Sequence, residues 1–535
     1  MNQRTRTDWL LLVGFCIFLF FYGLGQFGLL GADEPRYAQV AREMLDRHDW
    51  ITPTLGGQAW LEKPVLYYWQ AMLAYRIFGV SDWAARLPSA VDASLLILGV
   101  YLFLRRLRPG FHLDGALMTA SAAGVVGFAH AATPDMPLAA MFALAMLAWY
   151  AWSETSQKLF LAGFYVFLAL ATLAKGPVAP VLAGAVLVLF ATAANDSRIL
   201  LRTLWIPGML LFVLVALPWY VAVQIRNPEF FRVFILEHNL ARFGTDLYHH
   251  RQPFWFYLPV ATVGLVPWIV FVVAGAAETA RAWWSERTAL FDSGDALNFF
   301  LLLWLIVPVL FFSLSQSKLP GYILPALPAG ALLVTEYVRR HVEDEEERPS
   351  FWLIGLHAVV ASAPVIPALL IQYLLLQHRL PWGTGSVIAS AVALVLAVGI
   401  ARTLRSKLGL RMLRFVTLIP VVVAMGALMK LGAPQCDATL SARPLAQQLA
   451  QMETRPLPLA VFGARRETEY GLAFYRNQAI SRYESHQIPF EEHLVVAPEG
   501  SGDAIAKLVG NRRVSHLGQY APQNLDYYWV AKGAN

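Results

Sequence analysis

The sequence contains few charged residues and almost no cysteine. Only 15% of its 535 residues are Asp, Glu, Lys or Arg, whereas 57% are hydrophobic. A soluble domain is usually about 25% charged and no more than about half apolar, so this composition argues against a soluble enzyme. The two cysteines, Cys16 and Cys436, lie inside the first apolar run and after the last one. We therefore expect no disulfide between them.

Long apolar runs dominate the rest of the chain. Runs of about 18 or more residues recur, and that length crosses roughly 30 Å of hydrocarbon. Counting them predicts about thirteen membrane-spanning helices between residues 9 and 430. The sequence therefore predicts an α-helical polytopic membrane protein. The net charge of +6 then reflects loop lysines and arginines, and it does not indicate a nucleic-acid partner.

Basic residues in the short loops predict the orientation of these helices. Arg4 and Arg6 precede the first span, and further basic clusters follow later spans at 105–108, 339–340 and 402–414. Because cytoplasmic loops are enriched in Lys and Arg, we expect the N-terminus in the cytoplasm of a bacterium. No small-residue cleavage site follows the first span, which indicates an uncleaved helix rather than a signal peptide.

Two segments are then expected outside the inner membrane. In the first loop, 31–86, apolar spacing predicts an amphipathic helix over 34–47 that lies on the membrane surface. Pro64 opens a second helix there, and Gly79 ends it. The tail, 431–535, is expected to form a periplasmic α/β domain after a transmembrane domain, 1–430. Its predicted strands are 457–462, 493–497 and 527–531, and its predicted helices are 440–452 and 503–509.

The remaining polar residues gather on the expected outer side. They are Asp33, Glu34, Arg36, Glu62, Lys63, Asp135, Lys175, His238, Arg242, Lys318 and Tyr322. Charges at a membrane boundary are costly unless they are paired or functional. A cavity lined by these groups would suit a substrate with a lipid tail, an anionic head group and a sugar. Lys and Arg would bind the phosphate, and a carboxylate would take a proton from the nucleophile or orient it.

Six short motifs, in this order, resemble C-type glycosyltransferases, which are integral membrane enzymes that use a polyprenyl-phosphate sugar. They are Asp33-Glu34-Pro35-Arg36, Glu62-Lys63-Pro64, Thr133-Pro134-Asp135, Ala174-Lys175-Gly176-Pro177, Glu237-His238-Asn239 and Lys318-Leu319-Pro320-Gly321-Tyr322. The motifs are most similar to bacterial lipid A 4-amino-4-deoxy-L-arabinose transferases, which are related to protein O-mannosyltransferases. The resemblance covers about 1–430, and the tail matches the family's periplasmic domain only in position and size.

The resemblance implies a role for each of these residues. Asp33 corresponds to the catalytic aspartate, and Glu62 and His238 correspond to residues that share a divalent metal, zinc. Further catalytic or cavity positions are Glu34, Asp135, Lys175 and Tyr322. The positions implied for the polyprenyl phosphate are Arg36, Lys63, Arg242 and Lys318.

Most of these residues also have a structural interpretation. Asp33 can cap the helix that follows it, because Asp ahead of a first-turn proline is a normal start signal. Asp135 and Lys175 can form an ion pair that joins two helix ends. Glu62 and His238 alone do not make a zinc site, since zinc usually takes three or four ligands.

The resemblance implies an inverting glycosyltransferase that moves a sugar from undecaprenyl phosphate to lipid A at the periplasmic face. The sugar would be 4-amino-4-deoxy-L-arabinose. Two alternatives are an enzyme like the protein O-mannosyltransferases, with a protein acceptor, and a transporter of lipid-linked sugars. The expected partners are the membrane, the sugar donor and one acceptor.

Cysteines introduced at Gln58 and Ser501 test the predicted topology. Both positions are expected on the non-cytoplasmic face, so both should react with a membrane-impermeant thiol reagent in intact spheroplasts. Labelling of only one position, or labelling only after lysis, would contradict the arrangement.

Overall fold

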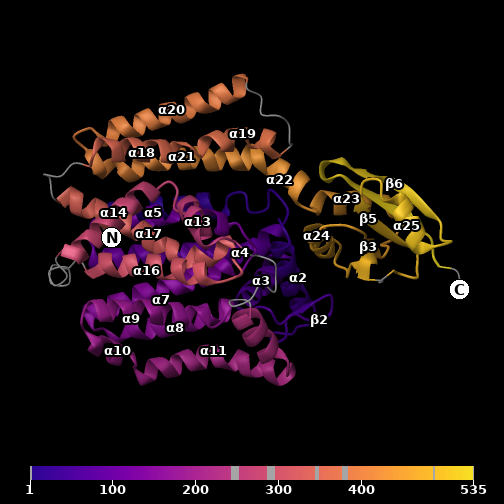
Figure 1. Ribbon diagram of the computed structural model, residues 1–535, viewed down its shortest axis with the longest axis horizontal. Helices are drawn as coiled ribbons and strands as arrows, with labels where there is room; N and C mark the ends of the chain where they lie inside the picture. The colour runs from indigo at the N-terminus through magenta and orange to yellow at the C-terminus, as the bar shows by residue number, and fades with distance from the viewer. Residues whose placement is uncertain are drawn as a thin grey trace.

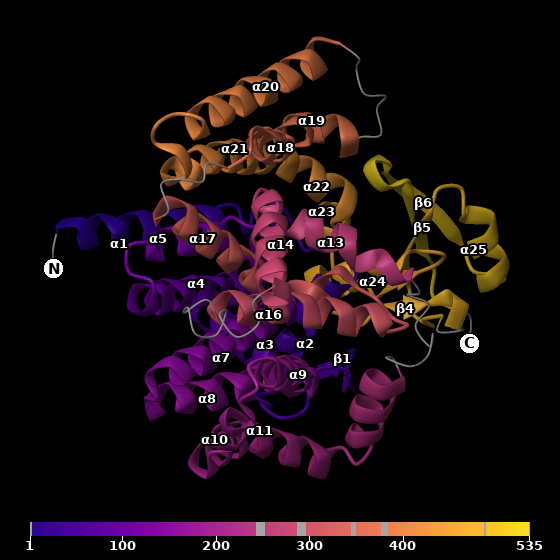
Figure 2. The same cartoon turned by 60° about the vertical axis from the view of Figure 1, so that its left-hand side comes forward.

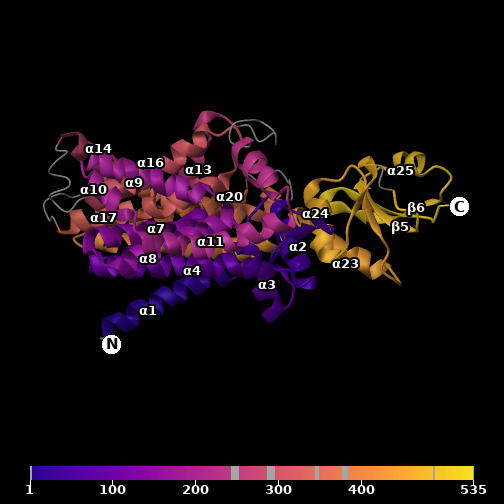
Figure 3. The same ribbon diagram turned by 90° about the horizontal axis from the view of Figure 1, so that it is seen from below.

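Helices that run side by side make up most of the chain, and a small sheet lies beyond one end of them (Figure 1). The structure is a computed structural model that describes residues 3–241, 252–285, 296–343, 349–375, 383–485 and 488–533. The N-terminus lies at the end of the bundle away from the sheet (Figure 3). The helices between 351 and 427 form a layer of their own on one side (Figure 2).

Nine helices among the described residues are long and apolar enough to cross a membrane. They are α4 (Asp82–Leu107), α7 (Asp135–Thr155), α8 (Lys158–Lys175), α11 (Ile206–Arg226), α16 (Ala296–Leu314), Pro320–Val342 with η4 and α17, Phe351–Ile371 with α18 and α19, α20 (Thr384–Leu404) and Gly409–Leu440 with α21 and α22. The helices Phe254–Gly264 and Ile269–Ser285 are bent by 116° relative to each other. If the two together are one span, the described residues contain ten candidate spans. The chain is therefore an α-helical polytopic membrane protein, as the sequence predicts.

Three other predicted spans are present as shorter or interrupted helices. The first consists of α1 (Gln3–Cys16) and a π-helical turn, η1 (Ile17–Phe21). The third is broken between α5 (His112–Ala120) and α6 (Ala123–Ala129), and the sixth is α9 (Val178–Ala193), with only 16 residues. The predicted number of about thirteen membrane crossings stays a prediction.

A serine with side-chain hydrogen bonds lies at the break between α5 and α6. The hydroxyl of Ser121 donates to the carbonyl of Leu117 at 2.7 Å and accepts a hydrogen bond from Trp268 Nε1 at 3.0 Å. A Ser side chain that bonds back to the preceding turn competes with the helical ladder, which weakens the helix at that point. Hydropathy does not detect such a break, because the surrounding residues stay apolar.

The loop 31–86, expected outside, forms the two predicted helices. They are α2 (Asp33–Asp46) and α3 (Leu66–Phe78), and Gly79 ends α3 with a positive φ of 80°. A short hairpin of β1 (Thr54–Leu55) and β2 (Gln58–Ala59) lies between them. Protein covers the apolar face of the first helix, and its predicted position on the membrane surface stays a prediction. Its buried Val40, Ala41 and Met44 belong to a helix that packs against α3 and against α24 (Arg466–Arg476) of the tail.

The tail forms a five-stranded mixed sheet in the order β4-β3-β5-β7-β6. The strands are β3 (Leu459–Val461), β4 (Ser481–Arg482), β5 (His493–Pro498), β6 (Val514–Tyr520) and β7 (Leu525–Val530). Leu445, Leu449 and Leu472, from α23 (Arg443–Met452) and α24 (Arg466–Arg476), are buried in the core on one face. Ile505, from α25 (Gly502–Val509), is buried in the core on the other. The predicted strands and helices are present within a few residues, whereas α24, β4 and β6 were not predicted.

A buried ion pair links the first outside loop to α4. Glu34 accepts hydrogen bonds from Arg86 Nε at 3.1 Å and Arg86 Nη2 at 2.7 Å. Its two oxygens also accept from the backbone N–H groups of Leu30 and Ala132, both at 2.7 Å. The fully buried Arg86 donates in addition to the carbonyls of Leu24, Phe27 and Gly28. Both charges therefore have their partners inside the protein.

Substitution of Arg86 by leucine tests how much this pair contributes to the stability of the fold. Arg86→Leu leaves Glu34 buried without its cation, and breaking a buried pair in this way costs about 3–5 kcal/mol. We expect a clearly lower unfolding midpoint in detergent, followed by tryptophan fluorescence. Arg76→Leu, at an exposed position of α3, is the matched control and should unfold like the wild type. A midpoint unchanged by Arg86→Leu would refute this role.

Candidate active site

A cavity of about 370 Å³ brings together residues that are far apart in the sequence. Four of the predicted site residues line it, namely Lys63, Lys175, His238 and Tyr322. Most of the remaining lining is apolar and comes from Leu138, Pro177, Val178, Val181, Phe234, Phe311 and Phe312. A mostly apolar cavity with a few convergent cations suits a ligand that has an apolar part and an anionic group.

Lys175 and Asp135 form an ion pair at the edge of this cavity. Asp135 is the first residue of α7 and Lys175 the last residue of α8, so the pair joins two helix ends, which confirms the structural alternative. The Lys175 ammonium also lies 4.6 Å from the centroid of the Tyr322 ring. A Cβ at Gly321 would lie only 2.6 Å from Asp135 Oδ1, so glycine allows η4 (Pro320–Ala326) to approach the pair.

Asp33 and Arg36 form a second pair on α2. Arg36 Nη2 lies 2.5 Å from Asp33 Oδ1, and half of the Asp33 side-chain surface is exposed. The residue that precedes α2 is Ala32, with no side-chain cap, so the interpretation of Asp33 as the helix cap was wrong. The guanidinium carbon lies 5.0 Å from the centroid of the Tyr37 ring and 5.2 Å from that of Trp60.

The charge of Arg36 is supported by its surroundings. Burial by itself lowers the pKa of the Arg36 guanidinium, but Tyr37, Asp33 and Glu62 raise it, and the net shift is upward. Glu62 therefore lies within electrostatic reach of Arg36 and directly precedes Lys63 of the cavity. The α2 pair and the cavity are thus neighbouring parts of one site.

Glu62 and His238 approach each other, but they do not complete a zinc site. His238 Nε2 lies 3.8 Å from Glu62 Oε1. The described part of the chain contains no group of three or more His, Cys, Asp and Glu side chains that could hold a metal ion. Two ligands fall short of the three or four that zinc usually takes from a protein. These residues therefore do not fit the implied zinc ion, and we derive no step through a metal.

Two other predicted residues make structural contacts, and a third is not described. Glu34 is saturated by Arg86 and two backbone N–H groups, so its observed contacts are structural. Lys318 is buried, and its ammonium donates to the carbonyls of Ser315 at 2.5 Å and Gln252 at 3.2 Å. Arg242 lies outside the described residues.

Sequence reasoning missed several polar groups at the site. Asn239, Ser315 and Ser317 line the cavity, and each lies within three residues of a predicted position. Their positions in the sequence, close to His238 and Lys318, could have identified them as site residues. Tyr470, from α24 of the tail, lies with its ring centroid 5.8 Å from the Arg36 guanidinium carbon. Nothing in the local sequence connects the tail with Arg36.

Related sequences point to one class of membrane enzyme. The family model described as dolichyl-phosphate-mannose-protein mannosyltransferase matches residues 62–221. A protein of Aeromonas salmonicida named undecaprenyl phosphate-alpha-4-amino-4-deoxy-L-arabinose arabinosyl transferase is 30% identical over 505 residues, 88% of each chain. A Pseudomonas aeruginosa protein of the same name is 36% identical over 340 residues. That second match covers 62% of this chain and 59% of the length of the relative.

Solved structures define the fold. ArnT from Cupriavidus metallidurans bound to undecaprenyl phosphate superposes with a TM-score of 0.76 at 23% identity, over 98% of each chain. The archaeal oligosaccharyltransferase AglB from Archaeoglobus fulgidus gives a TM-score of 0.52 at 12% identity, over 95% of this chain and 71% of its own. The fold is that of the C-type integral membrane glycosyltransferases. With the full-length similarity to the Aeromonas protein, the chain belongs to the family of undecaprenyl phosphate-alpha-4-amino-4-deoxy-L-arabinose arabinosyl transferases.

Replacement of Lys175 tests whether the cavity binds a lipid phosphate. A hydrogen bond from a charged donor contributes about 1.5–3 kcal/mol, so Lys175→Met should weaken undecaprenyl phosphate binding by roughly tenfold to a hundredfold. Lys158→Met changes the exposed lysine at the other end of α8 and should bind like the wild type. The measurement is titration of the purified protein in nanodiscs. Equal affinities of Lys175→Met and the wild type would place the phosphate elsewhere.

Proposed function

We propose that this chain is an inverting glycosyltransferase that moves 4-amino-4-deoxy-L-arabinose from undecaprenyl phosphate to lipid A. The observation that carries the proposal is the cavity with Lys63 and Lys175, which neighbours the Asp33–Arg36 pair. The names of the relatives supply the sugar and the lipid carrier. The cations supply what a phosphate requires, and the apolar lining suits the start of a prenyl chain.

Unpaired donors around Arg36 support an anionic or sugar ligand at this place. Within the described part of the chain, Arg36 Nε, Trp60 Nε1 and the Tyr68 hydroxyl are buried and have no hydrogen-bond partner. Leaving a buried donor unsatisfied costs about 1–3 kcal/mol. The oxygens of a phosphate and a sugar would accept these hydrogen bonds, so the bound donor would remove that cost.

In the proposed reaction, the bond between the anomeric carbon and the phosphate oxygen breaks while an acceptor oxygen bonds to the same carbon. The acceptor attacks from the face opposite the leaving group, which inverts the carbon. The electron pair of the broken bond stays on undecaprenyl phosphate, where negative charge develops. Arg36 and Lys63 stabilise this charge more in the transition state than in the ground state, which is the condition for faster reaction.

Asp33 is proposed to act on the acceptor. Its carboxylate is half exposed at the start of α2, so an acceptor could reach it while Arg36 holds it from one side. With a hydroxyl acceptor, Asp33 takes the proton that the hydroxyl loses. A lipid A phosphate is already anionic, and Asp33 would then orient the sugar's amino group instead.

The proposal includes a topology. The N-terminus and the basic loops would lie in the cytoplasm, about thirteen helices would cross the inner membrane, and the cavity and the tail 431–535 would face the periplasm. The position of the N-terminus at the end of the bundle away from the tail supports this arrangement (Figure 3). Lipid A would then meet the site from the outer leaflet.

A protein acceptor is the second candidate. The match of residues 62–221 to the mannosyltransferase model favours it, because that model describes transfer to protein. The two candidates differ in the acceptor and share the chemistry. Mass spectrometry of lipid A and of secreted proteins, in a strain with and without the gene, separates them. Loss of an aminoarabinose mass from lipid A supports the proposal, and loss of a sugar mass from proteins alone would contradict it.

The substitution Asp33→Asn tests the catalytic role. Asp33 is half exposed, and the amide oxygen of asparagine can still accept a hydrogen bond from Arg36, so the change should cost about 1 kcal/mol of stability or less. A general base contributes roughly a hundredfold to ten-thousandfold to a rate, and transfer to a hydroxyl acceptor should fall by that order. Asp46→Asn, at the exposed other end of α2, should transfer at the wild-type rate. Full activity of Asp33→Asn with every acceptor would end this assignment.

A further inference from the structure

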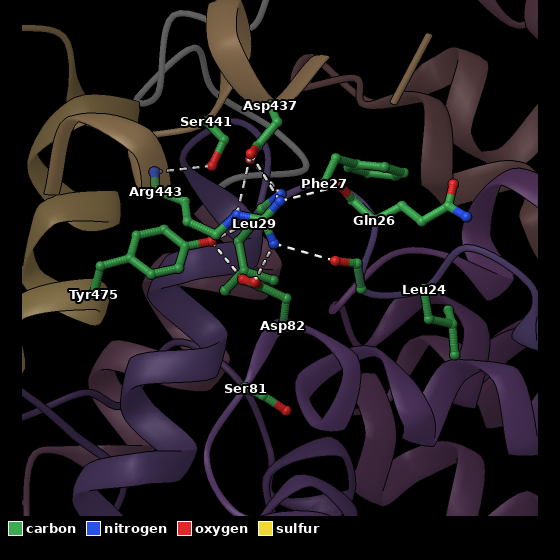
Figure 4. Close-up of polar contacts among 12 residues, drawn as sticks. Leu24, Gln26, Phe27, Leu29, Ser81, Asp82, Asp437, Ser441, Arg443 and Tyr475 are labelled. Carbon is green, nitrogen blue, oxygen red and sulfur yellow. Dashed lines mark hydrogen bonds and ion pairs between the residues drawn. The ribbon is translucent and has the colours of Figure 1, made fainter. Parts of the chain in front are cut away.

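A polar junction joins the tail to the segment that directly precedes α2 (Figure 4). At its centre lies Arg443, the first residue of α23. Its Nη1 lies 2.9 Å from Asp82 Oδ2 at the start of α4, and its Nη2 lies 2.8 Å from Asp437 Oδ2. Asp82 also accepts a hydrogen bond from the hydroxyl of Tyr475 at 2.5 Å. The side chains of Arg443, Asp82 and Asp437 are all less than one fifth exposed.

The same groups hold the backbone of residues 24–30. Arg443 donates to the carbonyls of Gly25 and Gln26, both at 3.1 Å. The N–H of Gly28 donates to Asp437 Oδ1 at 2.8 Å, and the N–H of Leu29 donates to the Tyr475 hydroxyl at 2.7 Å. Four hydrogen bonds with two charged groups and a tyrosine are a strong constraint on so short a segment.

At Gly28, the tail and the 24–30 segment are in close contact. A Cβ at this position would lie 2.1 Å from Ser441 Oγ and 2.6 Å from the Tyr475 hydroxyl. Only glycine leaves room for the tail at this distance. The junction is therefore a fitted contact in which a small displacement of the tail would move the 24–30 segment.

The other side of this segment contacts the ion pair behind the site. Arg86 donates to the carbonyls of Phe27 and Gly28, and the N–H of Leu30 donates to Glu34. Asp33 follows only three residues after Leu30. Residues 24–30 are thus held between the tail junction and the Glu34–Arg86 pair, and they lead directly into the helix that carries Asp33 and Arg36.

The tail also contacts α2 itself. Arg42 of α2 donates to the carbonyl of Phe474 at 3.0 Å. One turn earlier in α24, the Tyr470 ring faces the Arg36 guanidinium. Helix α24 therefore contacts α2 at Arg42 and at the guanidinium of the charged pair.

We infer that the tail is part of the transfer machinery, with Arg443 and Tyr475 as positioning residues that fix Asp33 and Arg36. This inference rests on the proposed function. The residues that line the cavity come from the membrane part and from the first outside loop. Loss of the junction should therefore lower kcat by a larger factor than it weakens the binding of undecaprenyl phosphate, because Lys63 and Lys175 of the cavity do not belong to the tail.

The test compares matched pairs of variants in the full-length protein. Tyr475→Phe removes the hydroxyl at the junction, whereas Tyr520→Phe removes a tail hydroxyl that donates only to the carbonyl of Ala438, at 2.9 Å. Arg443→Gln breaks the junction pair, whereas Arg476→Gln breaks a buried pair with Glu453 inside the tail. The readouts are kcat per folded molecule, the Kd for undecaprenyl phosphate, and amide exchange of residues 24–40.

Tyr475→Phe and Arg443→Gln should lower kcat at least tenfold, raise Kd by a clearly smaller factor and speed amide exchange of residues 24–40. The two controls should change none of these per folded molecule. A wild-type kcat in Tyr475→Phe, or unchanged exchange in both junction variants, would overturn the inference. If the wild type itself transfers no sugar, the proposed function fails, and the exchange data still decide whether the junction holds the segment.

Discussion

The buried ion pair between Glu34 and Arg86 is the contact on which the arrangement of the site depends. Two charges inside a protein are tolerated only if each is paired and hydrogen-bonded, and here both conditions hold. Glu34 binds Arg86 and two backbone N–H groups, while Arg86 also binds three carbonyls of residues 24–28. Through these hydrogen bonds, the pair connects α2, α4, residues 24–30 and the turn before α7.

This constraint separates the roles of two neighbouring acids. Glu34 points into the protein, and its two oxygens are occupied by hydrogen bonds from Arg86 and two backbone N–H groups. Asp33, one residue earlier, leaves half of its side-chain surface exposed and shares Arg36 with a site that contains unpaired donors. The buried pair therefore fixes the start of the helix that carries Asp33 and Arg36, the residues proposed to act in transfer. The tail contacts the same segment from the other side through Arg443 and Tyr475.

The sequence predicts those features that depend on local pattern. Apolar spacing predicts α2, and Pro64 with Gly79 predicts α3. The order of six motifs predicts Lys63, Lys175, His238 and Tyr322, which the structure brings to one cavity. Long-range contacts escape such reasoning. The partner of Glu34 is 52 positions away, and nothing in the sequence distinguishes Arg86 from an orientation charge. The tail's contacts with α2 and with residues 24–30 connect segments more than 400 positions apart.

The proposed transfer requires that the cavity and the Asp33–Arg36 pair act on the same sugar donor. The most direct test is a stoichiometric assay with the purified protein in nanodiscs, undecaprenyl-phosphate aminoarabinose and lipid A. The proposed reaction predicts one undecaprenyl phosphate released for each aminoarabinose that appears on lipid A, with inversion at the anomeric carbon. Binding of the donor without transfer to lipid A, a protein or any other acceptor would contradict it.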